Sequence, residues 1–262
     1  MTATSHLRVA LVFCLVLVGI PASLEAQFGP LASPGQAAQA RSQEELDSYL
    51  EIVGATDARA IVQRVKVFVS EFPKSELSGA AYQYQLQAFE RLNDFDGMLA
   101  AGEKALAADP DSLNTLLALA PAVANRAAAR PDRVQLLSQA ESYALRALDG
   151  VDKIRVPREL SIEKWNLRKH EMQSEAHGVL GVVAFQRGQS PQAIRELEMA
   201  ISLAPRPKGV QFLRLGLALA AAGKKDDAEQ NLRHAAALGP DSVHNVALDQ
   251  LKKLNEGQRT PR

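Results

Sequence analysis

The most restrictive feature of this sequence is internal repetition. Residues 174–207 align without gaps on residues 209–242 at an offset of 35, which is a unit of 34 residues plus one linker residue. A fixed period of this length is typical of repeat architectures, so we expect stacked copies of one small unit. Eight positions match: Leu180/Leu215, Gly181/Gly216, Ala184/Ala219, Gly188/Gly223, Ala193/Ala228, Leu197/Leu232, Ala200/Ala235 and Pro205/Pro240.

The matching positions have the spacing of two packed helices. In each unit three of them lie on one face of a first helix, and a glycine ends that helix in the left-handed conformation. Three more form a stripe on a second helix, which a proline stops because it cannot continue the hydrogen-bond ladder. Small residues among them allow the helices to approach closely. After Pro240, Asp241 and Ser242 are suited to cap the next helix.

This pattern resembles the tetratricopeptide repeat (TPR), a helix-turn-helix unit of 34 residues. The resemblance implies an all-α, right-handed superhelical solenoid of antiparallel helix pairs with a C-terminal cap helix. Composition agrees, since the chain is rich in alanine and leucine and only 5% aromatic, which favours helix.

Two further units precede this pair. Residues 79–112 form one, with Asn93 in place of the turn glycine, and asparagine also tolerates the left-handed conformation. Residues 42–75 form the other, with a degenerate first helix around 43–53. Its second helix has a 3.6-residue apolar period at Ile61, Val65, Phe68 and Val69.

The middle unit, residues 113–150, carries an insertion. Its first helix is expected over 113–125, with Pro121 inside it as a source of a kink. The partner helix carries Ala140, Ala144, Ala147 and Leu148, eight residues later than a strict unit would place them. We assign the extra residues to an enlarged turn over 126–133.

Residues 150–160 are expected to form a loop. Beyond it, one helical stripe runs from Leu160 to Val183. It predicts that the first helix of the 174–207 unit starts near Glu159 and runs to Arg187; a separate short helix over 159–173 is the alternative. Residues 243–256 are amphipathic and suit a cap helix, and residues 257–262 form a polar tail.

The N-terminus has the organisation of a secretory signal peptide. Arg8 precedes a 12-residue apolar run with one glycine, over 9–20, which is followed by Pro-Ala-Ser-Leu-Glu-Ala, an exit that contains several small residues and ends at Ala26. We expect cleavage after Ala26, with Ala22 or Ser23 as alternative sites, and a flexible linker over 27–41. The protein is therefore expected in the periplasm or secreted; an uncleaved N-terminal anchor in the inner membrane is the alternative.

Charge and cysteine content exclude several functional classes. The net charge is zero, which argues against a dedicated nucleic-acid binder. Charge is uneven, however: residues 1–125 hold 8 Lys/Arg and 14 Asp/Glu, a net −6, and such asymmetry is able to orient a partner. Cys14 is the only cysteine, so no disulfide within the chain and no cysteine-based zinc site is expected.

Catalytic and cofactor signatures fail on spacing. The sequence holds no GxxxxGK[ST], no HExxH and no GxSxG. His170 and His177 lie two helical turns apart, but no further metal ligands accompany them. We therefore expect no enzyme activity, no cofactor and no metal site.

The TPR resemblance implies a concave face lined by first-helix side chains that binds a protein or peptide. Only Arg214 falls at a position of the Lys/Asn/Arg clamp by which some family members hold a C-terminal carboxylate, which argues against that mode. The contribution of the 209–242 unit is mostly apolar and is expected either to dock a partner helix or to pack on the cap helix. The predicted groove residues are Gln83, Tyr84, Gln87, Glu90, Arg91, Glu175, Val179, Val182, Phe185, Gln186, Val210, Leu213, Arg214 and Leu217.

These features together predict a non-catalytic interaction or scaffold module of the periplasm or cell envelope, whose partner is a protein or peptide and not nucleic acid. The alternative is a substrate-binding or adaptor subunit of an envelope enzyme complex.

Overall fold

The computed structural model describes residues 38–154 and 160–259. The predicted signal peptide and most of the predicted linker lie outside these residues. Within this part of the chain all regular secondary structure is helical. The helices are α2 (Gln43–Val53), α3 (Ala58–Glu71), α4 (Ser78–Arg91), α5 (Phe95–Ala108), α6 (Leu113–Ala127), α7 (Arg133–Lys153), α8 (Ile162–Gln186), α9 (Ser190–Leu203), α10 (Gly209–Ala221), α11 (Lys225–Leu238) and α12 (Asp241–Arg259).

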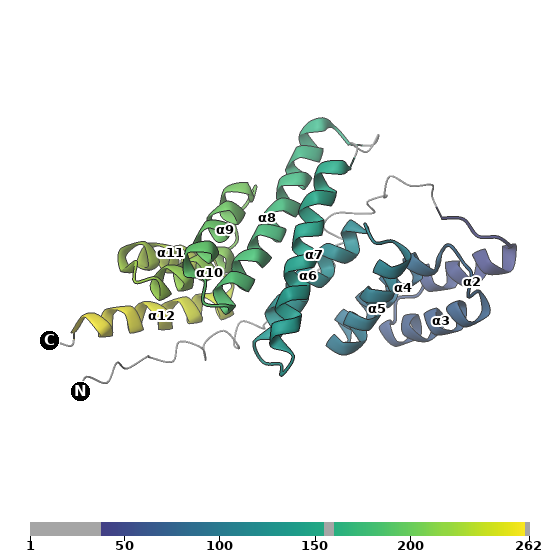
Figure 1. Ribbon diagram of the computed structural model, residues 1–262, viewed down its shortest axis with the longest axis horizontal. Helices are drawn as coiled ribbons and strands as arrows, with labels where there is room; N and C mark the ends of the chain where they lie inside the picture. Colours follow the sequence, from purple (N-terminus) through teal and green to yellow (C-terminus); the bar gives the residue numbers. More distant parts are fainter. Residues whose placement is uncertain (1–37, 155–159, 260–262) are drawn as a thin grey trace.

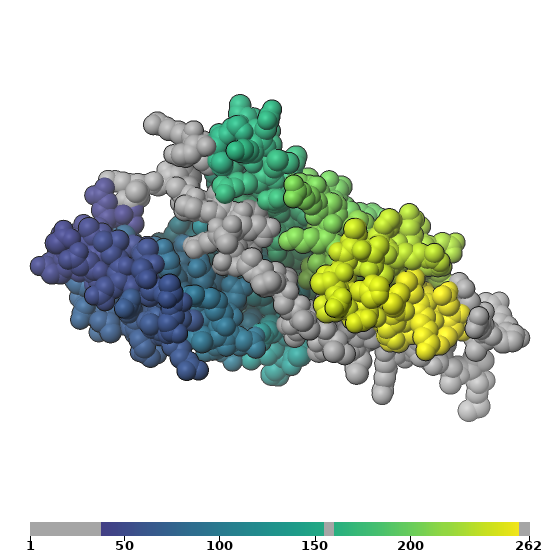
Figure 2. All heavy atoms as spheres, turned by 180° about the vertical axis from the view of Figure 1, so that it is seen from behind, coloured from purple at the N-terminus to yellow at the C-terminus, as the bar shows by residue number. Residues whose placement is uncertain are grey.

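Successive helices pack as antiparallel pairs that follow one another along the long axis of the molecule (Figure 1). The pairs are α2/α3, α4/α5, α6/α7, α8/α9 and α10/α11, and α12 packs on the last of them. Seen from behind, α2 and α3 form one end of the molecule and α12 lies toward the other (Figure 2). The fold is the predicted all-α, TPR-like solenoid.

The turns within three of the pairs share one backbone conformation. Gly188 and Gly223 have φ values of +77° and +76°, and Asn93 has φ +55°, as predicted. In each turn the following residue donates its N–H to a carbonyl five residues back, for example from Gln189 to Ala184 at 2.9 Å. This is the 6→1 bond of a Schellman motif, which satisfies a carbonyl at the helix end.

Close approach of the paired helices requires the matched glycines. A Cβ placed on Gly181 of α8 would lie 2.5 Å from Cγ of Leu197 on α9, and one on Gly216 of α10 would lie 2.8 Å from Cγ of Leu232 on α11. Both leucines are fully buried. The repeated Gly–Leu pair therefore packs a leucine directly onto backbone in two successive units, as the small residues of the pattern predict.

The insertion in the third pair is mostly helix. The predicted enlarged turn over 126–133 is present but shorter, over residues 128–132, because α6 continues to Ala127 and α7 begins at Arg133. Pro121 lies inside α6, which is assigned as one helix. Arg133, the first residue of α7, donates to the carbonyl of Gln186 at the end of α8. This bond links the third helix pair to the fourth.

Two other boundaries differ from prediction. Residues 150–153, predicted as loop, belong to α7, because the helix must continue to bury Val151 in the main core. Asp241 and Ser242 lie inside α12 and do not cap it; the amide of His244 bonds to the carbonyl of Pro240, so Pro240 occupies the N-cap position.

Helix α8 is one continuous helix of 25 residues, which decides between the two alternatives for residues 159–173. Ser161 caps it by accepting a bond from the amide of Lys164 at 3.3 Å. The C-terminal end of α7 and the N-terminal end of α8 project together beyond the neighbouring helices (Figures 1 and 2). Trp165 and Met172 of α8 are buried in the main core.

Candidate functional site

The apolar residues predicted for the groove are buried in the protein itself. Val179 and Val182 belong to the main core, which extends from α4 to α8. Leu213, which is 1% exposed, and Leu217 pack in one cluster with Val243 and Ala247 of α12. These residues were expected either to dock a partner helix or to pack on the cap helix. The structure shows that they pack on the cap helix, so neither side chain is accessible to a partner.

Several other predicted groove residues contact the protein's own helices. Phe185 is half-buried and packs against the cluster of Leu213 and Leu217 and against a second apolar cluster on the other side of α10. Val210 packs in the cluster of Leu213 and Leu217. The ring of Tyr84 lies edge-on to Tyr49 of α2, with centroids 6.3 Å apart. Arg91 donates to the carbonyl of Thr56, between α2 and α3, at 3.0 Å. These contacts hold neighbouring units together.

A polar cluster joins the first helices of three successive units. Arg214 of α10 donates to Oδ1 of Asn125 on α6 at 3.2 Å, and Gln186 of α8 donates to the carbonyl of Ala124 on α6 at 2.7 Å. Burial raises the pKa of Glu175 on α8, an effect that the positive charges of Arg214 and Lys208 oppose. Burial likewise lowers the pKa of Arg214, and the charge of Glu175 opposes that shift.

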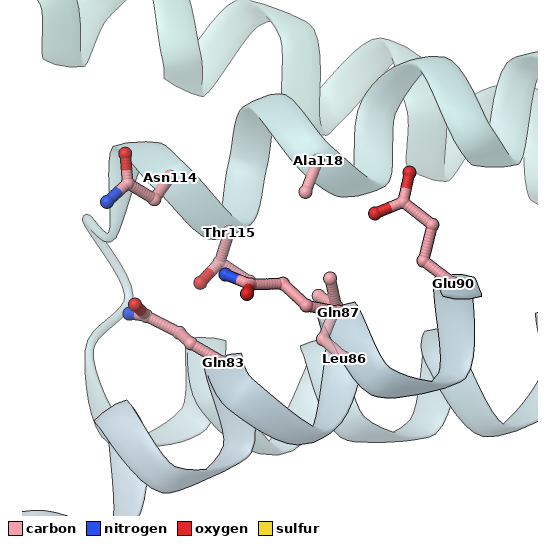
Figure 3. Close-up of a pocket in the computed structure, with 7 residues that line it drawn as sticks. All are labelled: Gln83, Leu86, Gln87, Glu90, Asn114, Thr115 and Ala118. Atoms are coloured by element: carbon pink, nitrogen blue, oxygen red, sulfur yellow. The ribbon is translucent and has the colours of Figure 1, made fainter. Parts of the chain in front are cut away.

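A shallow, open pocket lies between α4 and α6. Figure 3 shows its side chains reaching toward one another from the two helices. We call it the α4/α6 pocket. Its lining residues are Gln83, Leu86, Gln87 and Glu90 of α4, and Asn114, Thr115 and Ala118 of α6.

The polar groups at one end of the α4/α6 pocket are hydrogen-bonded among themselves. Gln83 donates from Nε2 to Oγ of Ser112 at 2.9 Å, and the Ser112 hydroxyl lies 2.9 Å from Oγ1 of Thr115. Asn114 Oδ1, by contrast, is buried and has no hydrogen-bond partner. A buried acceptor without a donor costs about 1–3 kcal/mol, and in Figure 3 this oxygen points away from Gln83 and Gln87 of α4.

Glu90 lies at the other end, on the rim. Its side chain meets solvent, yet the surrounding protein raises the pKa of its carboxyl. Among the described residues no ion pair involves Glu90. The pocket therefore presents a partly desolvated carboxylate without a counter-charge.

Of the predicted groove residues, Gln83, Gln87 and Glu90 line this pocket together. The sequence analysis did not predict Asn114, Thr115 and Ala118, because it considered only the insertion in the third unit and assigned no groove positions there. Asn114 and Ala118 occupy positions 2 and 6 of residues 113–150, which are concave-face positions in the other units. Applying the same position rule to the third unit would have identified both.

Residues 38–154 and 160–259 present neither a metal-binding cluster nor a membrane-spanning helix. No group of three or more histidine, cysteine, aspartate or glutamate side chains is arranged to hold a metal ion there. His177 pairs instead with Glu196 of α9, with Nδ1 2.8 Å from Oε2. Within the same residues, none of the helices is both long and apolar enough to cross a membrane.

No protein-family model matches the sequence, and no curated protein is significantly similar to it. Solved structures are similar at low identity. A thermophilic TPR protein of Thermus thermophilus is 15% identical with a TM-score of 0.45, over 82% of this chain and 98% of that chain. PilW, a type IV pilus biogenesis factor, is 14% identical with a TM-score of 0.40, over 78% of this chain and 99% of that chain. Acl4, an assembly chaperone of RpL4, is 13% identical with a TM-score of 0.43, over 83% and 98%. The repeat architecture of this chain is established by its own helix pairs.

Proposed function

We propose that the protein is a non-catalytic interaction module that holds a segment of a partner protein in the α4/α6 pocket. The observation that carries this proposal is the opening between α4 and α6, the first helices of two successive units, which is lined by Gln83, Gln87 and Glu90 on one side and by Asn114 on the other. The amide and carboxylate side chains of this lining can hydrogen-bond to the backbone of an extended segment.

The proposed location is the periplasm or another compartment outside the inner membrane. Its support is the sequence of residues 1–26, with its charged start, short apolar run and small-residue exit. N-terminal sequencing of the protein recovered from cells tests this proposal. A mature chain starting at Gln27 supports export, and a chain that keeps residues 1–26 in the cytosolic fraction contradicts it.

Site-specific photo-crosslinking tests the interaction. A photoreactive amino acid replaces Gln87 in the α4/α6 pocket, and in a matched protein it replaces Val134, which is 82% exposed on α7. In cell-envelope extract, the Gln87 protein is expected to form a discrete crosslinked product that the Val134 protein lacks. Identical products from both positions, or none from Gln87, would contradict binding in this pocket. If the crosslinked partner is an enzyme, the protein is an adaptor subunit of an envelope enzyme complex.

A further inference from the structure

The second and third units, α4/α5 and α6/α7, are joined by the chain at one edge of the solenoid. The connection from α5 to α6 spans residues 109–112, and Gln83 at the near end of the α4/α6 pocket bonds to Ser112 there at 2.9 Å. Glu90 lies toward the opposite end of the pocket (Figure 3). At that opposite edge the chain does not connect the two units, so side-chain contacts limit how far α4 and α6 separate.

Two arginines of the third unit make contacts at the unconnected edge. The guanidinium carbons of Arg126, near the end of α6, and Arg130, in the α6–α7 turn, lie 5.6 and 5.7 Å from the centroid of the Phe95 ring. Phe95 is buried and is the first residue of α5. A cation within about 6 Å of an aromatic ring is attracted by its π system. Both arginines therefore hold the start of α5 against the end of α6.

Polar bonds to the α4–α5 turn accompany this contact. Arg126 donates to Oδ1 of Asn93, the turn residue with positive φ. Arg130 Nη2 lies 3.1 Å from Oδ1 of Asp96, and its Nε lies 3.2 Å from Oδ1 of Asp132. Charge-assisted bonds of this kind fix the orientation of a guanidinium group. The turns of two successive units are thus bonded to each other.

The insertion in the third unit supplies the bonding groups. The α6–α7 turn spans residues 128–132, whereas the α8–α9 turn spans only residues 187–189. The longer turn carries both Arg130 and Asp132. Its next residue, Arg133, donates to the carbonyl of Gln186 at the end of α8, so the turn is also anchored to the fourth unit.

We infer that Arg126 and Arg130 form a clasp that closes the unconnected edge between the second and third units and so holds the α4/α6 pocket at the width that binds the partner. Both are positioning residues, because neither lines the pocket. This inference rests on the proposed function and names what controls the geometry of that site. Without the clasp, the units are free to rotate about the 109–112 connection. Helix α4 has 14 residues and is roughly 21 Å long, so a rotation of about 10° moves its far end by about 4 Å.

Distances between spin labels in the purified full-length protein test the clasp. The labels are attached to cysteines that replace Gln63 of α3 and Val134 of α7, both exposed. The only native cysteine, Cys14, is changed to serine. We call these two positions the clasp pair, because Val134 directly follows the clasp turn and Gln63 lies in the half of α3 nearer the same edge.

A second pair of labels serves as the internal reference. It replaces Ser70 of α3 and Leu145 of α7, which are exposed on the same two helices near the connected edge. The bond from Arg146 to the carbonyl of Pro110 places this part of α7 beside the 109–112 connection. A rotation about that connection changes the reference distance less than the clasp distance.

The Arg126→Ala/Arg130→Ala double variant is expected to broaden the clasp-pair distances and to lengthen them by about 4 Å for a 10° rotation. The reference distances are expected to stay nearly unchanged. The corresponding double lysine variant keeps both charges but lacks the planar groups that stack on a ring, and it is expected to open to an intermediate extent. The matched control, Arg195→Ala/Arg233→Ala, removes two exposed arginines of α9 and α11 and is expected to leave both pairs unchanged.

Crosslinking from Gln87 then tests whether the clasp controls binding. A photoreactive residue at Gln87 in the alanine double variant is expected to give a yield of the discrete product at least about threefold below that of the wild-type background, since fewer molecules have the binding geometry. The Arg195→Ala/Arg233→Ala background is expected to give the full yield. Circular dichroism verifies that each variant is folded, and if the alanine variant is not, the lysine variant decides by the same comparisons.

Three results would overturn the inference. These are unchanged clasp-pair distances in the double variant, equal lengthening of the clasp and reference pairs, or an unchanged crosslink yield in an opened variant. The last result leaves the proposed function intact, because the pocket still binds its partner. If the wild-type background gives no discrete product from Gln87, the proposed function fails, and the label distances still decide whether the two arginines set the separation of the units.

Discussion

Arg214 on α10 donates from Nη2 to Oδ1 of Asn125 on α6 at 3.2 Å, across 89 residues of sequence. The bond joins two units that are not neighbours in the repeat order, because the α8/α9 pair lies between them. Glu175 of α8 lies near enough for its charge and that of Arg214 to affect one another's pKa. Three helices are thus connected electrostatically on one side of the solenoid.

Replacing Arg214 by alanine is expected to destabilise the protein. The substitution removes the bond to Asn125 and takes a positive charge away from the neighbourhood of Glu175. Hydrogen bonds to charged groups contribute about 1.5–3 kcal/mol. We therefore expect the free energy of unfolding, measured by urea denaturation at pH 7, to fall by about that amount. The matched variant Arg233→Ala, whose side chain is exposed on α11, is expected to change stability by less than about 0.5 kcal/mol. Equal losses of stability in both variants would show that Arg214 contributes no more to stability than an exposed arginine.

Glu175 is expected to make stability depend on pH. Burial raises the pKa of this carboxyl above its ordinary value of 4.5, so between the two values the folded state holds a proton that the unfolded state has lost. Stability from this group is therefore present below about pH 4.5 and is lost as pH rises through the folded-state pKa. Glu175→Gln removes the titration and is expected to increase stability relative to wild type at pH 7 more than at pH 4, by thermal unfolding at both pH values. A wild-type-to-variant difference that is constant with pH would contradict this assignment.

Two glycines of α8 are expected to respond oppositely to alanine. A Cβ on Gly181 would meet the side chain of Leu197 at 2.5 Å, whereas a Cβ on Gly178 lies at an ordinary 3.9 Å from the Ala200 Cβ. Gly181→Ala is expected to cost about 1–3 kcal/mol by overpacking. Gly178→Ala is expected to stabilise the helix by about 0.5–1 kcal/mol, because alanine is the better helix former. Denaturation midpoints of the two variants measure both effects, and a shift of the same sign in both would refute the packing argument.

Leu213 is expected to behave as a core residue and not as a binding residue. Its side chain packs in the cluster that includes Val243 and Ala247 of α12. Leu213→Ala is therefore expected to cost about 2–4 kcal/mol of stability and to increase hydrogen exchange in α12. The matched variant Leu238→Ala, at the exposed end of α11, is expected to cost less than about 1 kcal/mol. Unaltered stability in Leu213→Ala would return this residue to the candidate groove.

The sequence predicted the features that depend on interactions within one unit. The left-handed turn at Gly188 and the glycine–leucine contact between Gly181 and Leu197 are set by residues within 34 positions of one another. Their chemistry is explicit in the residue types, since few residues adopt a positive φ and few allow so close an approach.

Features that depend on contacts between units were predicted less well. Val179 and Val182 occupy concave-face positions, but α6 packs on α8 closely enough to bury them. Leu213 is covered by α12, which lies beyond α11 in the chain. The repeat pattern does not encode how far one unit rotates against the next, and that rotation decides which first-helix residues meet solvent. For the same reason, the pocket that Glu90 and Asn114 line together depends on how α4 and α6 lie side by side.

The unbroken course of α8 has a consequence for how the molecule opens. In ideal repeat proteins each unit contacts only its neighbours and stability is a sum of local terms, so units open independently. Here α8 packs against α7, α9 and α6, and one core runs from Leu86 to Val183. The segment from α4 to α8 is therefore expected to open as a single cooperative block. Partial unfolding is confined to the outer pairs, so the two ends of the solenoid can exchange with solvent while its centre remains closed.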